Sequence, residues 1–231
     1  KNFKMKKKIT SLILLFFLII SCNKETKHLV NNIGKTIFYE IEFQDKDNNK
    51  DIYRQSYHFL PSQKNLIPVI KNNGELIVYL QEINGISKIA IKDKQLVNTE
   101  NLTRNHDLKR VIAFPVSVGT EWETEDVTTI QLKMGFDRIY NTDLPVKLNN
   151  KIISTNENIL VNGNKVSDCI EISSYGETSF IPGPPLDKIK IEIISKTWYS
   201  KELGVVRYER EEKSDSATTG NIYYNKTLLI D

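Results

Sequence analysis

The stretch "KIKIEIISKTWYSKELGVVRYEREE", residues 188–212, decides the fold. Ile189, Ile191 and Ile193 alternate with charged neighbours, which is the period-two pattern of a strand with one face buried and the other in water. A second apolar run resumes directly after Gly204, a residue that can adopt a positive φ without strain. The segment therefore predicts two antiparallel strands joined by a tight turn.

The same period continues on both sides of this hairpin. "TIFYEIEF", residues 36–43, alternates apolar and acidic side chains and is followed by turn residues at 45–49. Asn84-Gly85 joins two more β-rich runs, which is a strong hairpin signal. Further strand-like runs are "VIAFPVSVGTEWETEDVTTIQLKM", "VKLNNKIIS", "NILVNGNKVSDCIEISS" and "NIYYNKTLLI".

No window of eleven residues shows a helical period of 3.6 residues. We therefore expect an all-β fold, mainly antiparallel, built as a curved sheet, a half-barrel or a β-sandwich-like single domain with at most minor helix. Residues 93–110 are polar and aperiodic, and they fit either a loop or one short helix.

The N-terminal segment has the three parts of an export signal. A basic cluster at residues 4–8 precedes the apolar core Leu12 to Ile20, and Met5 is the expected start. The core of about nine residues would be roughly 14 Å long as a helix, against about 30 Å of bilayer hydrocarbon, so it is too short for a permanent span. We interpret residues 1–21 as a signal peptide.

Ile19-Ile20-Ser21-Cys22 resembles the lipobox of bacterial lipoproteins. The resemblance implies cleavage between Ser21 and Cys22, a diacylglyceryl thioether on Cys22 and acylation of the new amino terminus. Residues 22–34 would then be a lipidated, flexible tether and residues 35–231 the β-rich domain. Asn23 follows the cysteine instead of an aspartate, which favours the outer membrane, facing either the periplasm or the surface. The alternatives are an ordinary secretory signal with an incidental cysteine, or a short signal anchor.

Cleavage changes the charge of the chain. The whole sequence has 32 basic and 29 acidic residues, a net charge of +3. Loss of the five lysines in residues 1–21 leaves 27 basic residues against 29 acidic ones, a net charge of −2. With no excess of basic side chains to neutralise phosphates, we expect no nucleic-acid partner.

Cys169 is the second of the two cysteines. Once Cys22 carries lipid, no intramolecular disulfide is possible, so the fold must depend on its core. Cys169 lies in the strand-like run "VSDCIEIS", and we expect it to be a small buried hydrophobic residue and not a reactive thiol.

Three motifs occur in the order "FPVSVGTEW" (114–122), "NILVNGNKVSDCIEI" (158–172) and "TWYSKELGVVRYER" (197–210). Together they resemble a pattern of uncharacterised bacterial envelope lipoproteins, over less than half of the mature chain. The resemblance implies a curved antiparallel sheet or sandwich-like domain, similar to the half-barrels that carry lipoproteins between membranes. It implies no established reaction.

Two pairs of residues are candidate contact sites. Trp122 and Trp198 could stack on a ligand at the β surface, or they could pack at the core or its rim. Phe180 and Ile181 precede a proline-rich stretch, and we interpret residues 174–188 as a long, partly rigid loop. Its apolar tip could contact a partner or a membrane, or it could cap an open end of the sheet.

Catalytic and metal sites are not predicted. Glu121, Glu123 and Glu125 share one strand face and could form an acid/base pair or bind calcium, but the alternation indicates a solvated face. Residues 45–51 lack the central glycine and terminal glutamate of a calcium loop, so turn chemistry explains them better. The three histidines, His28, His58 and His106, are scattered along the sequence. No motif of a catalytic nucleophile or a phosphate-binding loop occurs, and no cofactor is predicted.

Three functions remain open. The leading hypothesis is a non-catalytic, lipid-anchored envelope domain that binds a hydrophobic ligand, a glycan or another envelope protein. A scaffold of an envelope complex is the second, and a carboxylate-dependent hydrolase the third. A cavity lined from several strands would favour ligand binding, a filled sandwich would favour scaffolding, and acids converging with His58 or His106 would favour the enzyme.

Overall fold

The computed structural model describes residues 32–91, 108–134, 138–183, 187–216 and 219–230, which form one twelve-stranded sheet. The strands are β1 (Thr36–Gln44), β2 (Lys50–Phe59), β3 (Leu66–Lys71), β4 (Leu76–Glu82), β5 (Gly85–Ile91), β6 (Lys109–Ala113), β7 (Glu121–Met134), β8 (Arg138–Val161), β9 (Asn164–Phe180), β10 (Ile189–Ser200), β11 (Gly204–Ser214) and β12 (Ile222–Leu229). Their order in the sheet is β6-β5-β4-β3-β2-β1-β12-β11-β10-β9-β8-β7.

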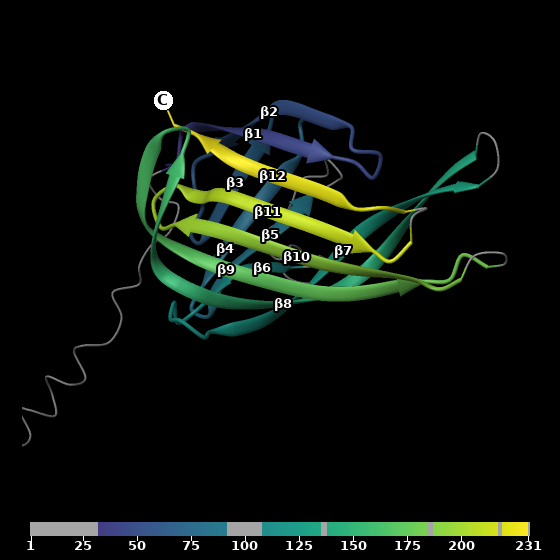
Figure 1. The fold of residues 1–231 in the computed structure, drawn as a ribbon. Coiled ribbons are helices and arrows are strands. Elements are labelled where there is room, and N and C mark those ends of the chain that lie inside the picture. Colours follow the sequence, from purple (N-terminus) through teal and green to yellow (C-terminus); the bar gives the residue numbers. More distant parts are fainter. Residues whose placement is uncertain (1–31, 92–107, 135–137, 184–186, 217–218, 231) are drawn as a thin grey trace, which may run out of the picture.

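Every neighbouring pair in this order is antiparallel, and the sheet curls into a nearly closed barrel (Figure 1). The chain follows the order from β1 to β6, crosses to the other edge at β7, and returns strand by strand to β12, which pairs with β1. The described residues contain no α-helix, so the prediction of an all-β, antiparallel, curved domain is confirmed. Within the part of the chain that the structure covers, no helix has the length and apolar character to cross a membrane.

The predicted hairpins are present. Between β1 and β2, the Asp45 carboxylate accepts hydrogen bonds from the backbone N–H groups of Asp47 and Asn49 at 2.9 and 2.8 Å. At the β10–β11 turn, Ser200 pairs with Gly204, whose φ is 80°. The β4–β5 hairpin is also confirmed, but its pairing leaves residues 83 and 84 as the turn, one position earlier than Asn84-Gly85.

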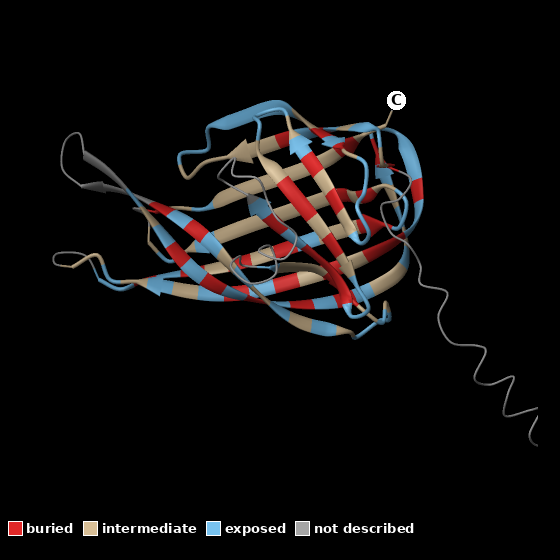
Figure 2. Cartoon of the chain, turned by 180° about the vertical axis from the view of Figure 1, so that it is seen from behind, coloured by how far each residue is buried: buried red, intermediate tan, exposed pale blue. Residues whose placement is uncertain are grey.

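Buried and exposed residues alternate along several strands (Figure 2). The core on the concave face has two main clusters, and a third, Val78 with Ile89, lies on the opposite face of β4 and β5. The larger cluster spans most strands, with Tyr39, Ile41 and Tyr199 among its buried members. In the smaller cluster the β7–β8 hairpin packs on β10 through Ile130, Leu144, Val146, Leu148, Ile189, Ile191 and Ile193. Cys169 is fully buried in the larger cluster, as predicted, and burial raises the pKa of its thiol to about 11.

One strand was not among the predicted ones, and one predicted loop is a strand. Residues 66–71 form β3, although Pro68 argues against a strand there. The long loop predicted at 174–188 is wrong, because β9 continues to Phe180 and pairs with β10 along its length, as far as Phe180 opposite Ile189. Gly176 makes this continuation possible, since a β carbon there would lie 2.4 Å from the Lys147 carbonyl oxygen of β8.

The N-terminal predictions lie mainly outside the described residues. Residues 1–31, which include the signal peptide with Ser21 and the lipidation site Cys22, are among those not described. At the end of the predicted tether, Asn32 is buried and Gly34 donates a backbone hydrogen bond to the Phe59 carbonyl at 2.8 Å, so residues 32–34 pack on the sheet. Of the aperiodic segment 93–110, Lys109 and Arg110 belong to β6 and residues 93–107 are not described.

Candidate functional site on the concave face

The concave face carries polar groups among its apolar ones. On β12 the inward positions are Ile222, Tyr224, Lys226 and Leu228, so a lysine occupies a position where the alternation otherwise places apolar or aromatic side chains. On β11 the inward positions include Arg210 and Glu212 by the same alternation. The strand pattern thus places ionisable groups inside the curled sheet.

Lys226 lies between aromatic rings. Its ammonium nitrogen is 4.5 Å from the centroid of the Tyr39 ring and 5.0 Å from that of Tyr57. The two rings meet edge to face, 4.9 Å apart, and the Tyr39 hydroxyl donates to the Val205 carbonyl at 2.8 Å. An ammonium group held over ring faces is stabilised by their negative quadrupole, so the rings fix the position of Lys226.

Two more lysines face the same space. Lys71 of β3 lies 5.6 Å from the Tyr57 ring and forms an ion pair with Glu75 at 2.7 Å. Lys88 of β5 pairs in register with Tyr79 of β4, on the inward face. We call these three lysines with Tyr39, Tyr57 and Tyr79 the lysine–tyrosine cluster.

Burial shifts the protonation of this cluster. Desolvation, followed by the positive charges of Lys88 and Lys71, lowers the pKa of Lys226 to about 7. Burial also lowers the pKa of Lys88, with Lys109 adding to the effect. Burial raises the pKa of Tyr79 to about 12, so its hydroxyl keeps its proton at neutral pH.

Lys88 is both exposed and desolvated. Much of its side-chain surface is uncovered, yet the surrounding protein is dense enough to lower its pKa. A side chain that projects into the space enclosed by a curled sheet, with no other side chain covering it, has both properties. Tyr53 of β2 supports this, because it faces inward opposite Ile41 and is still 49% exposed. Part of the concave face is therefore accessible.

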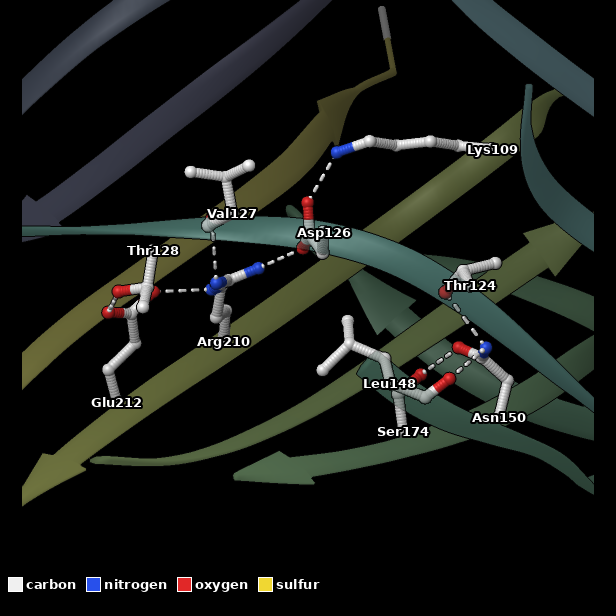
Figure 3. A network of polar contacts seen from close by, with 10 residues as sticks. All are labelled: Lys109, Thr124, Asp126, Val127, Thr128, Leu148, Asn150, Ser174, Arg210 and Glu212. Carbon is white, nitrogen blue, oxygen red and sulfur yellow. Dashed lines mark hydrogen bonds and ion pairs between the residues drawn. The ribbon is translucent and has the colours of Figure 1, made fainter. Parts of the chain in front are cut away.

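An ion-pair network joins three strands beside this cluster. Figure 3 shows the Asp126 carboxylate of β7 between Lys109 of β6 and Arg210 of β11, and the Lys109–Asp126 distance is 2.5 Å. Arg210 also donates from Nε to Glu212 at 2.7 Å, and Thr128 donates to the same carboxylate. Burial alone would raise the pKa of Asp126, but Lys109 and Arg210 outweigh it and lower the pKa. We call these five residues the Asp126 network.

A pocket lies next to this network, at the ends of β1, β11 and β12. Its volume is about 370 Å³, and we call it the mouth pocket. Four apolar side chains line it, together with the Thr128 and Glu212 end of the Asp126 network; the apolar residues are Phe43, Ile130, Ile191 and Ile222. Its rim is polar and includes Asp45, Lys46, Asn141 and Thr219. The volume is typical of small-molecule sites, and the lining combines these apolar side chains with a larger number of polar ones.

The structure does not place the predicted aromatic pair in this pocket. Trp122 is half-buried against the larger core cluster, and its indole N–H donates to the Arg110 carbonyl at 3.2 Å. Trp198 also packs against that cluster, and Arg207 covers its ring with a separation of 5.6 Å. Neither residue lines the mouth pocket, and their role as ligand contacts stays a prediction.

Phe180 and Ile181 separate at the end of β9. Phe180 packs against the smaller core cluster, whereas Ile181 is 71% exposed in the turn that follows. Ile181 thus remains available for a partner contact.

The acidic run divides between the two faces of β7. Glu121, Glu123 and Glu125 are exposed, as a solvated face predicts, and Asp126 alone of the run turns inward. His58 is exposed and its Nδ1 lies 2.9 Å from the Thr36 hydroxyl, away from these acids. Among the described residues no group of three or more histidine, cysteine or acidic side chains could hold a metal ion. His28 and His106 are not described.

The sequence prediction missed the lysine–tyrosine cluster and the Asp126 network. A signal was present on two strands. In "NIYYNKTLLI" the inward set contains Lys226, and in "VVRYEREE" it contains Arg210 and Glu212. Charged residues at positions that the strand period assigns to the apolar face indicate a polar interior site.

Comparison with known proteins adds little to this picture. No protein-family model matches the chain, and no curated protein matches it. The solved structure of "a putative lipoprotein from Parabacteroides distasonis ATCC 8503" is similar with a TM-score of 0.36 and 12% sequence identity, covering 83% of this chain and 92% of that one.

Proposed function

We propose that this chain is a non-catalytic, lipid-anchored envelope protein whose curled sheet binds a hydrophobic ligand in the mouth pocket. The lipobox at Ile19–Cys22 supports the anchor, and the following asparagine supports the outer membrane. The pocket itself is the observation on which the binding function rests. Its volume of about 370 Å³ falls within the range of small-molecule sites, about 300 to 1,000 Å³, and four apolar side chains form part of its wall.

The contacts of the polar groups support binding without catalysis. Glu212, the carboxylate in the wall, already accepts from Arg210 and Thr128. A general acid or base needs a free approach to the reacting atom, and each carboxylate oxygen of Glu212 already accepts one hydrogen bond from the protein. We therefore assign Glu212 and Thr128 to orienting the ligand.

A substitution that fills the mouth pocket tests the proposal. Ile222 lines the mouth pocket, so Ile222→Trp fills part of the pocket with an indole. Val127→Trp adds the same indole at an exposed outward position of β7 and is the matched control. We expect the wild-type domain and Val127→Trp to bind the neutral dye Nile red, and Ile222→Trp to bind it about ten-fold more weakly or worse, since the apolar contact area is lost. Fluorescence titration measures the difference.

Equal binding by Ile222→Trp and wild type would show that the dye binds elsewhere. Native mass spectrometry of the mature domain, purified from its own envelope without its lipid, is the second measurement. A co-purifying ligand that Ile222→Trp lacks supports the proposal. If no ligand co-purified and the dye affinity did not depend on Ile222, the binding function would be abandoned.

A further inference from the structure

We propose that Lys226 and Lys88, inside the curled sheet, bind the carboxylate of a fatty acid whose hydrocarbon chain extends to the mouth pocket. This inference rests on the proposed function, because the chain of the acid is the hydrophobic ligand of that pocket. It adds what the pocket alone does not provide, namely the headgroup and the residues that recognise it.

The first step is the charge balance inside the sheet. Lys71 forms an ion pair with Glu75, and Lys109 and Arg210 share Asp126. Neither Lys88 nor Lys226 forms an ion pair with a carboxylate of the described residues, and the contacts of Lys226 are the two tyrosine rings. An ammonium group without a counter-ion in a partly buried site is costly, so the site is complementary to an anion from outside the chain.

The second step is hydrogen bonding. Desolvation and the raised pKa keep the Tyr79 hydroxyl protonated, so it can donate, and Tyr79 lies opposite Lys88 in the β4–β5 register. The Tyr39 hydroxyl is engaged by the Val205 carbonyl and that of Tyr57 by the Gln55 side chain at 3.0 Å, so these two contribute their rings. Two ammonium groups and one hydroxyl match the several acceptor sites of a carboxylate, and such charge-assisted bonds are the strong ones.

The third step is the path between the two sites. Ile222, Tyr224 and Lys226 follow one another on the inward face of β12, and Ile222 lines the mouth pocket. Lys226 lies four positions along the strand from Ile222, about 13 Å at about 3.3 Å per residue. An extended hydrocarbon chain with a terminal carboxylate spans such a distance, whereas a small inorganic anion would leave the apolar pocket empty.

Protonation of Lys226 should control the binding. The ionisable groups around it come from the surrounding strands: the rings of Tyr39 and Tyr57, the charges of Lys71 and Lys88, and Tyr208 opposite it on β11. Tyr79 lies opposite Lys88 on the same inward face. Burial raises the pKa values of these tyrosines, so they stay neutral near neutral pH, where Lys226 changes charge. With the pKa of Lys226 at about 7, the ammonium form that binds a carboxylate is lost as the pH rises above neutrality.

Dodecanoate and dodecanol provide the test, because they share a chain and differ in the headgroup. Both are titrated against Nile red bound to the mature domain at about pH 6.5, where a carboxylic acid of ordinary pKa is ionised. We expect wild type to bind dodecanoate about ten-fold more tightly than dodecanol, the size of one charge-assisted hydrogen bond. Lys226→Met should abolish this preference and leave the affinity for dodecanol unchanged, and raising the pH to about 8.5 should reduce it in wild type.

Two further variants keep the result interpretable. Lys88→Met should weaken the preference by itself, so the outcome does not depend on one substitution that could disturb folding. Lys196→Met is the matched control, since Lys196 is an exposed lysine on the outward face of β10 and should leave the preference intact. Equal binding of acid and alcohol by wild type would overturn the headgroup assignment and leave the proposed function standing. A preference that survives both Lys226→Met and Lys88→Met would overturn the site, and failure of both compounds to bind would overturn both proposals.

Discussion

At the scale of the residue, Lys226 shows how one position can decide what a strand does. The period of β12 requires an inward side chain there, and an apolar residue would contribute to the core without cost. A lysine instead lies over two tyrosine rings, and its pKa falls to about 7 because the surroundings disfavour its charge. The alternation identifies the face on which Lys226 lies, but its neighbours come from β1, β2, β3 and β5, which the sequence alone does not bring together.

Cys22 is the predicted site of lipid attachment. Cys22→Ser removes the only thiol in the lipobox, so we expect the variant to accumulate as uncleaved precursor or as protein that leaves the membrane fraction on washing. Fractionation followed by intact-mass measurement distinguishes the wild type, with its acyl groups, from the variant. Cys169→Ser is the control, because that thiol is buried in the core and should have no part in anchoring. Wild-type membrane association of Cys22→Ser would contradict the lipoprotein assignment.

Among the strands, those that the sequence predicts are the ones in which a turn signal adjoins a run of alternating apolar and polar residues. The hairpins at residues 45–49, 83–84 and 200–204 were predictable because turn residues bound alternating runs. The β3 strand was not predictable, because Pro68 removes a backbone donor, and its place is decided by pairing with β4. The course of β9 through 174–180 likewise depends on β8 and β10, which flank it.

Gly176 lies where β8 leaves no room for a side chain on β9. A side chain there would place its β carbon 2.4 Å from the Lys147 carbonyl oxygen and 2.8 Å from Leu148 Cδ2. We expect Gly176→Val to lower the free energy of unfolding by about 2 to 3 kcal/mol, because the packed β7–β8 hairpin must move away from β9 and β10. Urea unfolding measures the loss. Ser179→Val, at an exposed position of the same strand, should change stability by less than about 0.5 kcal/mol. A Gly176→Val protein as stable as Ser179→Val would show that β8 does not need the close approach.

At the scale of the whole molecule, the barrel closes without a backbone ladder between its edges. β6 and β7 stand at opposite ends of the strand order, and the structure joins them through side chains. The Trp122 indole donates to the Arg110 carbonyl, and Lys109 forms an ion pair with Asp126, which also binds Arg210 across the interior. Sequence reasoning could predict a curved sheet from its strands, but closure depends on contacts between segments up to 84 residues apart, which no local pattern encodes.

Substitution of Asp126 therefore tests how much these side-chain contacts contribute to closure of the barrel. Asp126→Asn keeps the volume of the side chain but removes the charge, leaving Lys109 and Arg210 without their shared carboxylate. We expect the free energy of unfolding at neutral pH to fall by about 1 to 3 kcal/mol, the range for partly buried groups that lose a charged partner. Glu125→Gln, the same chemical change at the adjacent exposed position, should have almost no effect.

Because Lys109 and Arg210 lower the pKa of Asp126 in the folded state, its contribution is present above the unfolded-state pKa of about 4 and disappears as the pH falls below it. Urea unfolding from neutral pH to about pH 3 should thus show wild type and Asp126→Asn converging in acid, with the amides of β6 and β7 exchanging fastest in the variant. A constant difference across this range would show that Asp126 acts through its shape and not through the charge that links the two edges.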